Sequence, residues 1–420
     1  MKAVVPRAPS ALVPLDRDAR APGRRSAITR AAFVSTYPPR RCGIATFTHD
    51  LAAASGASEI VALHPQGAAA SYPLEVHHRI RKDERADYGK VAQVLNRCVD
   101  VVSIQHEYGI WGGPDGDAVI DFVEALRVPA VVTLHTVLGQ PTPRQRSIQA
   151  RLIEVAETAV VMSRSAANLL IAEYDVDPQR LEVIHHGVPN VPLVDAATVK
   201  PGLEVDGRDV ILSFGLLGPS KGYELAIEAL PAVVAAHPNA LYVIVGATHP
   251  DLIAREGEAY RQSLARRVAQ LGLTRHVRFI DRFVGRTELV RWLEASDVFV
   301  TPYPSLDQIV SGTLSYAMGA GRAIVSTPYT YAAELLADGR GVLVPPGSTA
   351  EMGAALSQLL GDPDGRAAIG RRAHAYSRRM IWPAVGEAYA ALFTRVAASP
   401  VLADVPAAAD VPVIAVAAHA

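Results

Sequence analysis

Short apolar runs rich in valine and isoleucine alternate along the chain with longer segments whose apolar residues recur at helical spacing. The first half contains AAFVST, EIVAL, VDVVSIQ, PAVVTLH, TAVVMS and LEVIHHG, and the second half contains DVILSFG, ALYVIVG, HVRFI, DVFVTPY, RAIVST and GVLVP. Strands that are apolar throughout and separated by helices are typical of parallel sheets covered on both faces. The pattern therefore predicts an α/β protein with two Rossmann-like, doubly wound domains of six strands each.

A stretch with little periodicity separates the two sets of strands. Proline and glycine recur in HHGVPNVPLVDAATVKPGLEVDGRD, as is usual between domains. We place the N-terminal domain at residues 29–190, a linker at 191–207 and the C-terminal domain at 208–378. Residues 1–28 and 398–420 are rich in Ala, Pro and Val without a clear period, which predicts weakly ordered tails.

The predicted fold also predicts where a ligand binds. In open parallel sheets, ligands bind beyond the carboxyl ends of the strands. Two such sheets that face each other across a linker make one cleft between the domains, so candidate residues are sought in the turns that follow the strands.

Composition narrows the classes of ligand. The chain has 420 residues, with 41 Lys and Arg against 42 Asp and Glu, so no overall field attracts nucleic acid and an anionic ligand must be held locally. Its two cysteines are too few for a disulfide framework. We find neither a secretion signal nor an apolar run of about 20 residues that could span a membrane. We expect a cytoplasmic protein, and contact with a membrane surface stays open.

Four candidates follow strands of the first domain. Gly43 precedes the helical segment IATFTHDL, where a backbone without a side chain lets an anion approach free amides; an ordinary turn is the alternative. His106 and Glu107 begin the polar, bulky loop HEYGIWGG, which suits a hydroxylated acceptor, although His106 could simply be bonded within the loop. His135 ends the next strand, where an imidazole could steer a hydroxyl or fill a structural role. His185 and His186 are expected to pack at the domain exit.

The second domain repeats this design. Its first strand leads through Gly215 and a Gly-Pro turn to Lys221, a flexible cation that could reach a phosphate or, alternatively, point into solvent. The spacing is not that of a Walker loop. After the strand DVFVTPY, Ser311 and Gly312 stand where the next helix begins, and a helix start with free amides is a second seat for phosphate.

Residues 30 to about 395 resemble a retaining glycosyltransferase of the two-Rossmann (GT-B) type, family 4, in particular its bacterial mannosyltransferase-like branch. The motifs that carry the resemblance are YPPRRCGIATFTHDL, QHEYGIWGG, VVTLHT, VIHHGVP, FGLLGPSKGYELAIEAL, DQIVSGTLSYAMGAGRAIVSTP and GRGVLVPPG. The resemblance implies two domains facing across a cleft, with a C-terminal helix at 379–397 that crosses back to the first domain.

The resemblance also implies roles for individual residues. It implies His135, Lys221 and Gln308 as catalytic, and His106, Glu107 and His135 as contacts of the acceptor. The residues implied to bind the donor are Gly43, Gly215, Lys221, Arg282, Ser311, Gly312, Tyr316 and Glu334.

Three positions depart from the family pattern. Leu216 stands where the family usually has Arg, and Gln308 and Tyr316 replace its paired glutamates. Gln308 can hydrogen-bond a sugar hydroxyl but carries no charge for a developing oxocarbenium ion, and Tyr316 can offer a hydroxyl. We therefore expect the helix start to bind phosphate through its backbone while neutral groups recognise the sugar.

The function implied by the resemblance is retaining transfer of a mannosyl or glucosyl group to a hydroxyl of a glycan or glycolipid. GDP-mannose is the favoured donor, UDP- or GDP-glucose are alternatives, and no metal is expected to be required. Two other functions stay open: a glycan phosphorylase that uses a sugar 1-phosphate on the same fold, and a catalytically silent protein that binds a nucleotide or sugar.

Overall fold

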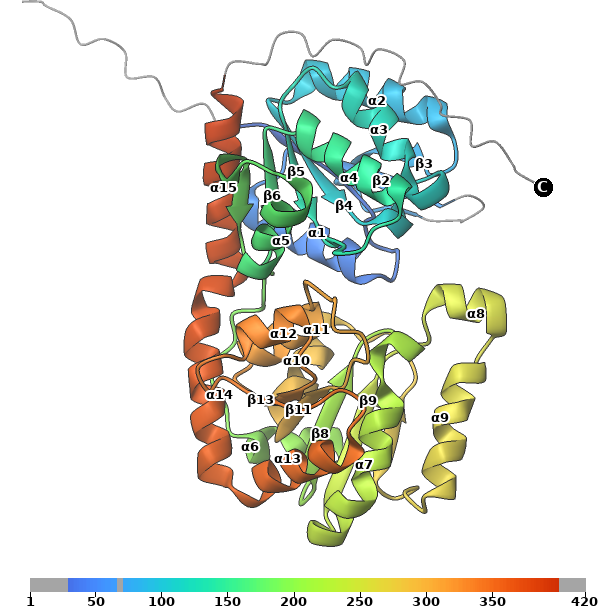
Figure 1. Ribbon diagram of the computed structural model, residues 1–420, viewed down its shortest axis with the longest axis vertical. Coiled ribbons are helices and arrows are strands. Elements are labelled where there is room, and N and C mark those ends of the chain that lie inside the picture. Colours follow the sequence, from blue (N-terminus) through green and yellow to red (C-terminus); the bar gives the residue numbers. More distant parts are fainter. Residues whose placement is uncertain (1–28, 66–70, 400–420) are drawn as a thin grey trace, which may run out of the picture.

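The computed structural model describes residues 29–65 and 71–399, and it contains two parallel α/β domains, one above the other in Figure 1. This confirms the predicted fold class. The predicted tail at 1–28 and residues 400–420 of the second tail lie outside the described residues.

The N-terminal sheet has the strand order β3-β2-β1-β4-β5-β6-β7, and all its pairings are parallel. Its strands are β1 (Ala31–Ser35), β2 (Glu59–His64), β3 (Val76–Arg81), β4 (Val101–His106), β5 (Ala130–Leu134), β6 (Thr158–Val161) and β7 (Leu181–Val183). The prediction of six strands was wrong by one, because the edge strand β3 is largely polar. Its sequence VHHRIR exposes alternate side chains, and only Ile80 is buried, so it lacks the apolar run of a central strand.

Helices cover both faces of this sheet. On one face α1 (Gly43–Ser55) packs against the C-terminal helix α15 (Trp382–Ala397), around Phe33, Leu51 and Phe393. The other face carries α2 (Arg85–Cys98), α3 (Ala118–Ala125), α4 (Pro143–Val155) and α5 (Arg164–Tyr174). Short 3₁₀ turns complete the domain at Tyr108–Ile110, Pro114–Gly116 and Pro178–Arg180.

The C-terminal sheet has the strand order β10-β9-β8-β11-β12-β13, again parallel throughout. Its strands are the six apolar runs predicted from the sequence: β8 (Asp209–Phe214), β9 (Ala240–Val245), β10 (Val277–Ile280), β11 (Val298–Thr301), β12 (Ala323–Ser326) and β13 (Val342–Leu343). In both sheets the order reverses beside the first strand, which is the topology of doubly wound folds.

Two helical layers enclose the second sheet. One layer consists of α7 (Tyr223–Ala236), α9 (Ala259–Gln270) and α13 (Thr349–Gly361). The other consists of α10 (Arg286–Ala295), α11 (Gly312–Gly319), α12 (Thr330–Leu335) and α14 (Pro363–Ser377). The helix α8 (Pro250–Glu256) stands at one side, and α14 and α15 run along the opposite side from the lower to the upper domain (Figure 1).

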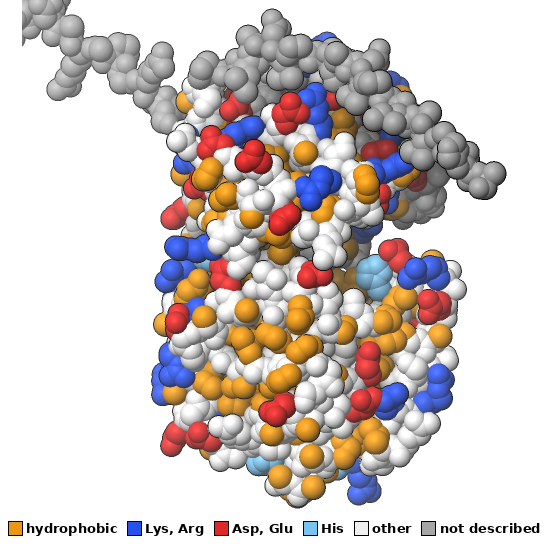
Figure 2. Space-filling view, in the orientation of Figure 1, with side chains coloured by type: hydrophobic (Ala, Val, Ile, Leu, Met, Phe, Trp, Pro, Cys, Tyr) orange, Lys and Arg blue, Asp and Glu red, His pale blue; other side chains and the backbone are white. Residues whose placement is uncertain are grey.

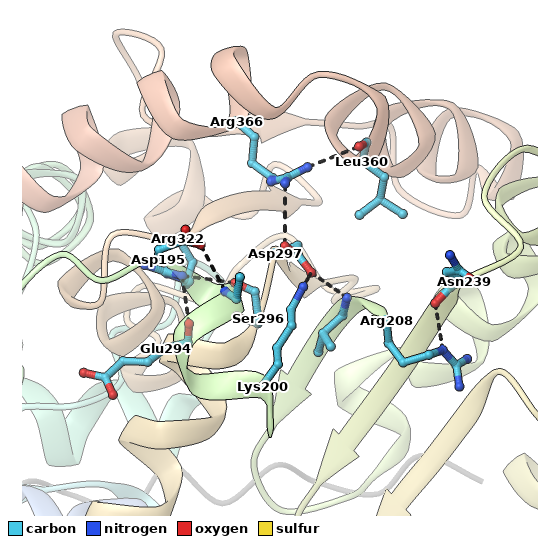
Figure 3. A network of polar contacts seen from close by, with 12 residues as sticks. Asp195, Lys200, Arg208, Asn239, Glu294, Ser296, Asp297, Arg322, Leu360 and Arg366 are labelled. Carbon is cyan, nitrogen blue, oxygen red and sulfur yellow. Dashed lines mark hydrogen bonds and ion pairs between the residues drawn. The ribbon is translucent and has the colours of Figure 1, made fainter. Parts of the chain in front are cut away.

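Much of the segment predicted as a linker is bound to the C-terminal domain (Figure 3). It forms α6 (Ala196–Val199) and the 3₁₀ turn Lys200–Leu203. The Lys200 ammonium lies 2.7 Å from the Asp297 carboxylate, and the buried Arg322 guanidinium donates to the Val194 carbonyl at 3.1 Å. A buried ion pair with further hydrogen bonds ties these residues to the domain, so they should move with it.

The chain passes between the domains twice, and the two passages lie side by side. Val188 and Ile381 form a parallel bridge, in which the Val188 amide donates to the Met380 carbonyl at 2.8 Å and the Trp382 amide donates to the Val188 carbonyl at 3.0 Å. The Trp382 ring lies so close to Gly187 that a Cβ there would come within 2.3 Å of it. The two passages between the domains are therefore bonded to each other and closely packed.

Candidate active site

The segments that follow the strands of both sheets meet between the domains. The Ser163 hydroxyl, just beyond β6, donates to the Ile309 carbonyl at 3.3 Å, in the loop beyond β11. A groove between the domains is lined by Ser165 and Asn168 on one side and by Asp307 and Thr330 on the other. Figure 2 shows the surface hollowed between the two domains on the side of α8. The cleft predicted from the topology is therefore present.

The start of α11 faces this cleft. Ser311 is the N-cap, and its Oγ accepts a hydrogen bond from the Leu314 amide at 3.3 Å, which is the usual way for serine to begin a helix. Gly312 is the first helical residue, and the first turn carries no acid. The remaining amides and the helix dipole make this end electropositive, so it is suited to a phosphate group.

Lys221 is connected to the start of α11 through the side chains of Tyr303 and Thr313. Its ammonium lies 4.2 Å from the centre of the Tyr303 ring, and the Tyr303 hydroxyl is 2.8 Å from Thr313 Oγ1 in the first turn of α11. A cation over an aromatic face is attracted by the ring, and this contact holds it in place. Gly215 closes the group: it has φ of +133°, and a Cβ there would lie 3.4 Å from Thr313 Cγ2. Gly215, Ser311 and Gly312, predicted separately, thus lie around Thr313, and Lys221 is joined to this group through Tyr303.

His135 places a neutral imidazole on the side of the cleft that the N-terminal domain forms, which we call the N-terminal wall. Its Nε2 lies 2.9 Å from Gln105 Oε1, while the Gln105 amide nitrogen donates to Ser103, so His135 Nε2 carries the proton and Nδ1 is an acceptor. The Phe47 ring meets the imidazole edge to face at 4.9 Å. Burial lowers the pKa of His135 to about 3. The group can therefore accept a hydrogen bond from a hydroxyl at neutral pH.

His106 and Glu107 lie at the base of their loop. His106 is fully buried beside the Tyr108 ring, neither of its ring nitrogens has a partner within the described residues, and burial lowers its pKa to about 3. The Glu107 carboxylate accepts a hydrogen bond from the Thr136 hydroxyl, and burial raises the pKa of this carboxyl group. Glu107 and His135 thus belong to one wall, because Thr136 directly follows His135.

His186 touches the helix start, a contact not anticipated from the sequence. Its Nδ1 lies 2.8 Å from the Gly187 carbonyl and so carries the proton, which leaves Nε2 as an acceptor. A Cβ at Gly312 would come within 2.9 Å of His186 Nε2. Burial lowers the pKa of His186 to about 4. His185, by contrast, packs as expected, with Nδ1 3.3 Å from the Met162 carbonyl.

Gly43 begins α1 behind an unusual cap. The Cys42 thiol accepts a hydrogen bond from the Ala45 amide at 3.3 Å, and no atom lies within 4 Å of the position that a Cβ on Gly43 would take. Crowding within the protein therefore does not explain this glycine. An open backbone at a helix start is consistent with the predicted approach of an anion.

The other predicted donor residues are engaged in contacts of their own. The Gln308 amide donates to the Val310 carbonyl at 2.8 Å and so stiffens the loop before α11. The exposed Arg282 forms an ion pair with Glu288. Glu334 reaches across the interface to the start of α5, where its carboxylate accepts hydrogen bonds from the Arg164 and Ser165 amides at 2.9 and 2.8 Å. Their roles in donor binding stay predictions.

The described residues show neither a metal cluster nor a membrane span. Within residues 29–65 and 71–399, no three His, Cys, Asp or Glu side chains are grouped so that they could hold a metal ion. In the same part of the chain, no helix combines the length and the apolar character needed to cross a bilayer.

Each domain matches a known family. Residues 43–190 match the model described as Glycosyltransferase Family 4, and residues 196–376 match the model described as Glycosyl transferases group 1. Among solved structures, Anabaena HepE in complex with UDP has a TM-score of 0.70 at 17% identity, covering 87% of this chain and 100% of that chain. Sucrose-phosphate synthase from Thermosynechococcus elongatus has a TM-score of 0.71 at 15% identity, covering 87% of this chain and 99% of that chain. Both domains are therefore similar to those of family 4-like glycosyltransferases, and the fold is GT-B.

Two curated relatives share one name. The D-inositol 3-phosphate glycosyltransferase of Thermobispora bispora is 28% identical over 294 residues, which are 64% of this chain and 65% of that protein. The enzyme of the same name from Corynebacterium efficiens is 25% identical over 302 residues, 68% of this chain and 70% of that protein. The match thus spans a little under two thirds of the first relative. Neither name refers to a mannosyltransferase, so the mannosyl branch stays a prediction.

Proposed function

We propose that the protein transfers a hexosyl group from a nucleotide-diphosphate sugar to a hydroxyl group. The observation that carries this proposal is the grouping of Lys221, Gly215 and the start of α11 around Thr313, at the carboxyl ends of the second sheet. A cation held over the Tyr303 ring, a glycine that lets a ligand approach the backbone and free helix amides together suit the binding of a diphosphate. His135 lies in the facing domain, where a hydroxyl acceptor would be held.

In the proposed reaction, charge develops on the leaving diphosphate. Lys221 and the α11 amides stabilise that charge as the bond between the anomeric carbon and the phosphate oxygen breaks. The acceptor oxygen forms the new bond to the anomeric carbon, and its proton passes to the departing phosphate. Retention through this route is what the family resemblance implies. The neutral His135 can accept a hydrogen bond from a sugar hydroxyl at Nδ1, and the proposed reaction does not require this nitrogen to be protonated.

The nucleobase of the donor is proposed from two observations, and they favour different bases. The resemblance favours GDP-mannose, with UDP- or GDP-glucose as alternatives. HepE, which has a similar fold, was solved with UDP and with UDP-glucose. We therefore place UDP-hexoses beside GDP-mannose as donors to be tested.

An anionic acceptor is favoured by two cations beside the loop that contains Glu107. The Lys82 ammonium donates to the Gly109 carbonyl at 2.9 Å, and burial together with the nearby Arg40 lowers the pKa of Lys82. Arg40 Nη1 is buried without a hydrogen-bond partner in the described part of the chain. An anion at this place would relieve the repulsion and satisfy the guanidinium. The names of the relatives make a phosphorylated polyol the first acceptor to test, beside a glycan or glycolipid.

The test is a matrix of donors and acceptors followed by mass spectrometry. UDP-glucose, GDP-glucose and GDP-mannose are each incubated with the protein and with either inositol 3-phosphate or free inositol. We expect one donor to give a glycoside and nucleoside diphosphate in equal amounts, with the phosphorylated acceptor preferred. Turnover from a sugar 1-phosphate alone would indicate a phosphorylase, and nucleotide binding without transfer would indicate a silent binding protein.

A further inference from the structure

Tyr316 occupies one of the two positions at which the related pattern has an acid, and its hydroxyl is not isolated. It lies in α11 between the rings of Phe214 and His186, each with its centre 6.2 Å away. Burial, and then the nearby Asp50 carboxylate, raise the pKa of the Tyr316 phenol above its usual value. The protonated hydroxyl therefore needs an acceptor, and Asp50 Oδ2 stands 3.5 Å away.

Asp50 belongs to the other domain and is unusually buried for a carboxylate. It lies in α1 among the buried residues Phe47 and Leu51, with only 4% of its side chain exposed. Its Oδ1 is 2.7 Å from Arg286 Nη1 and 3.1 Å from His49 Nδ1. Arg286 is the first residue of α10, so two of the three groups that face the carboxylate come from the C-terminal domain.

A buried carboxylate is costly unless it is paired. In the described arrangement, which we call closed, Arg286 and Tyr316 pair the buried carboxylate; if the domains separated, water would replace both partners and His49 of α1 would remain beside it. The cost of burying Asp50 on closure is therefore offset only when Arg286 and Tyr316 meet it, so this pairing selects the closed arrangement in which the Tyr316 hydroxyl is ordered. The Asp50–Arg286 pair also places one negative and one positive charge in the cleft. The resemblance implies that Leu216, Gln308 and Tyr316 replace three charged residues there.

We propose that Asp50 is a positioning residue that acts across the cleft, holding Arg286 and the Tyr316 hydroxyl in the closed arrangement that binds the donor. This inference rests on the proposed function for its donor. Asp50 itself is not assigned a contact with the reacting atoms. It supplies from α1 the carboxylate that α11 lacks, and only while the domains are closed.

The test compares Asp50→Asn, Arg286→Gln and the double variant with the wild-type chain. Arg291→Gln is the matched control, because Arg291 lies in the same helix and is exposed, and among the described residues its side chain donates to the Gly202 carbonyl at 3.1 Å, within its own domain. Small-angle scattering of the protein without ligand measures closure, and calorimetry with UDP and GDP measures nucleotide affinity.

We expect both single variants to increase the radius of gyration and to weaken nucleotide binding by about tenfold, because affinity falls in proportion to the closed fraction. The double variant should be no worse than either single one, and Arg291→Gln should match wild type. Unchanged scattering for Asp50→Asn, or effects of the two substitutions that simply multiply, would overturn the inference. If the wild-type chain binds neither nucleotide, the proposed function fails, while the scattering comparison still decides whether Asp50 holds the domains closed.

Discussion

Lys221 is the residue whose replacement should affect transfer most. A charge-assisted hydrogen bond to a phosphate contributes about 1.5–3 kcal/mol, and removal of one preorganised donor from a developing anion costs about 10²–10³ in rate. Because the resemblance implies that Leu216 replaces an arginine, we expect Lys221 to neutralise more of the diphosphate charge here. We expect Lys221→Ala to lower kcat/KM by about 10² or more.

The contact with Tyr303 gives this prediction a second arm. A cation–π contact contributes about 0.5–2 kcal/mol, so Tyr303→Leu, which removes the ring beneath the ammonium, should cost about 3- to 30-fold. Tyr303→Phe keeps the ring and loses only the hydroxyl that meets Thr313, so it should cost less than Tyr303→Leu. The exposed Lys90 in α2 provides the control, and Lys90→Ala should be neutral.

The assay is steady-state release of nucleoside diphosphate at saturating acceptor, together with thermal melting to confirm that each variant is folded. A folded Lys221→Ala protein with wild-type kcat/KM would refute the assignment of Lys221 to the diphosphate. Equal losses in Tyr303→Leu and Tyr303→Phe would show that the hydroxyl, and not the ring, positions the lysine.

Three further outcomes are expected. Gln308→Glu should lower kcat/KM by about tenfold or more, because it replaces the donor to the Val310 carbonyl with a negative charge, and Leu216→Arg should restore part of the loss; a gain from Gln308→Glu alone would contradict this. Gly187→Ala should destabilise the protein by about 1–3 kcal/mol in thermal melts, since its methyl group meets the Trp382 ring; an unchanged melting temperature would count against the packing argument. The pKa of His106 is about 3 in the folded protein and about 6.5 in the unfolded chain. Between these two pH values His106 is therefore protonated only in the unfolded chain. As pH falls from 6.5 toward 4, His106 should lower the free energy of unfolding by about 1.4 kcal/mol per unit, and His106→Leu should flatten the denaturant-measured slope by that amount.

Most of the strands that could be predicted are buried on both faces. In the second sheet the central strands β8, β9, β11 and β12 are apolar because helices cover both sides of them, whereas the edge strands β10 and β13 are only partly buried. The edge strand β3 has a neighbouring strand on one side only, and its His77, Arg79 and Arg81 are exposed. These polar residues interrupt the apolar run by which a strand is found in the sequence. The edge strands β7, β10 and β13 were nevertheless predicted from their apolar residues, so the polar sequence of β3, and not its edge position alone, explains why it was missed.

The positions of the residues proposed to bind the donor could be predicted because these residues follow strands of one parallel sheet. Lys221, Ser311 and Gly312 each lie in a turn whose destination is fixed by the parallel topology. Contacts between domains are different, because no local spacing relates Asp50 to Arg286, or Glu334 to the start of α5. Those pairings depend on how the domains close, which a one-dimensional pattern does not encode.

The most direct test of the central claim is hydrogen exchange measured with and without saturating donor nucleotide, using UDP and GDP in separate experiments. We predict that one of them slows exchange at residues 215–223 and 311–316, the two segments that surround Thr313, and leaves the outer helices α3 and α4 unchanged. Protection confined to α3 and α4, or no protection between 311 and 316 despite measured nucleotide binding, would contradict the assignment of the diphosphate to the start of α11.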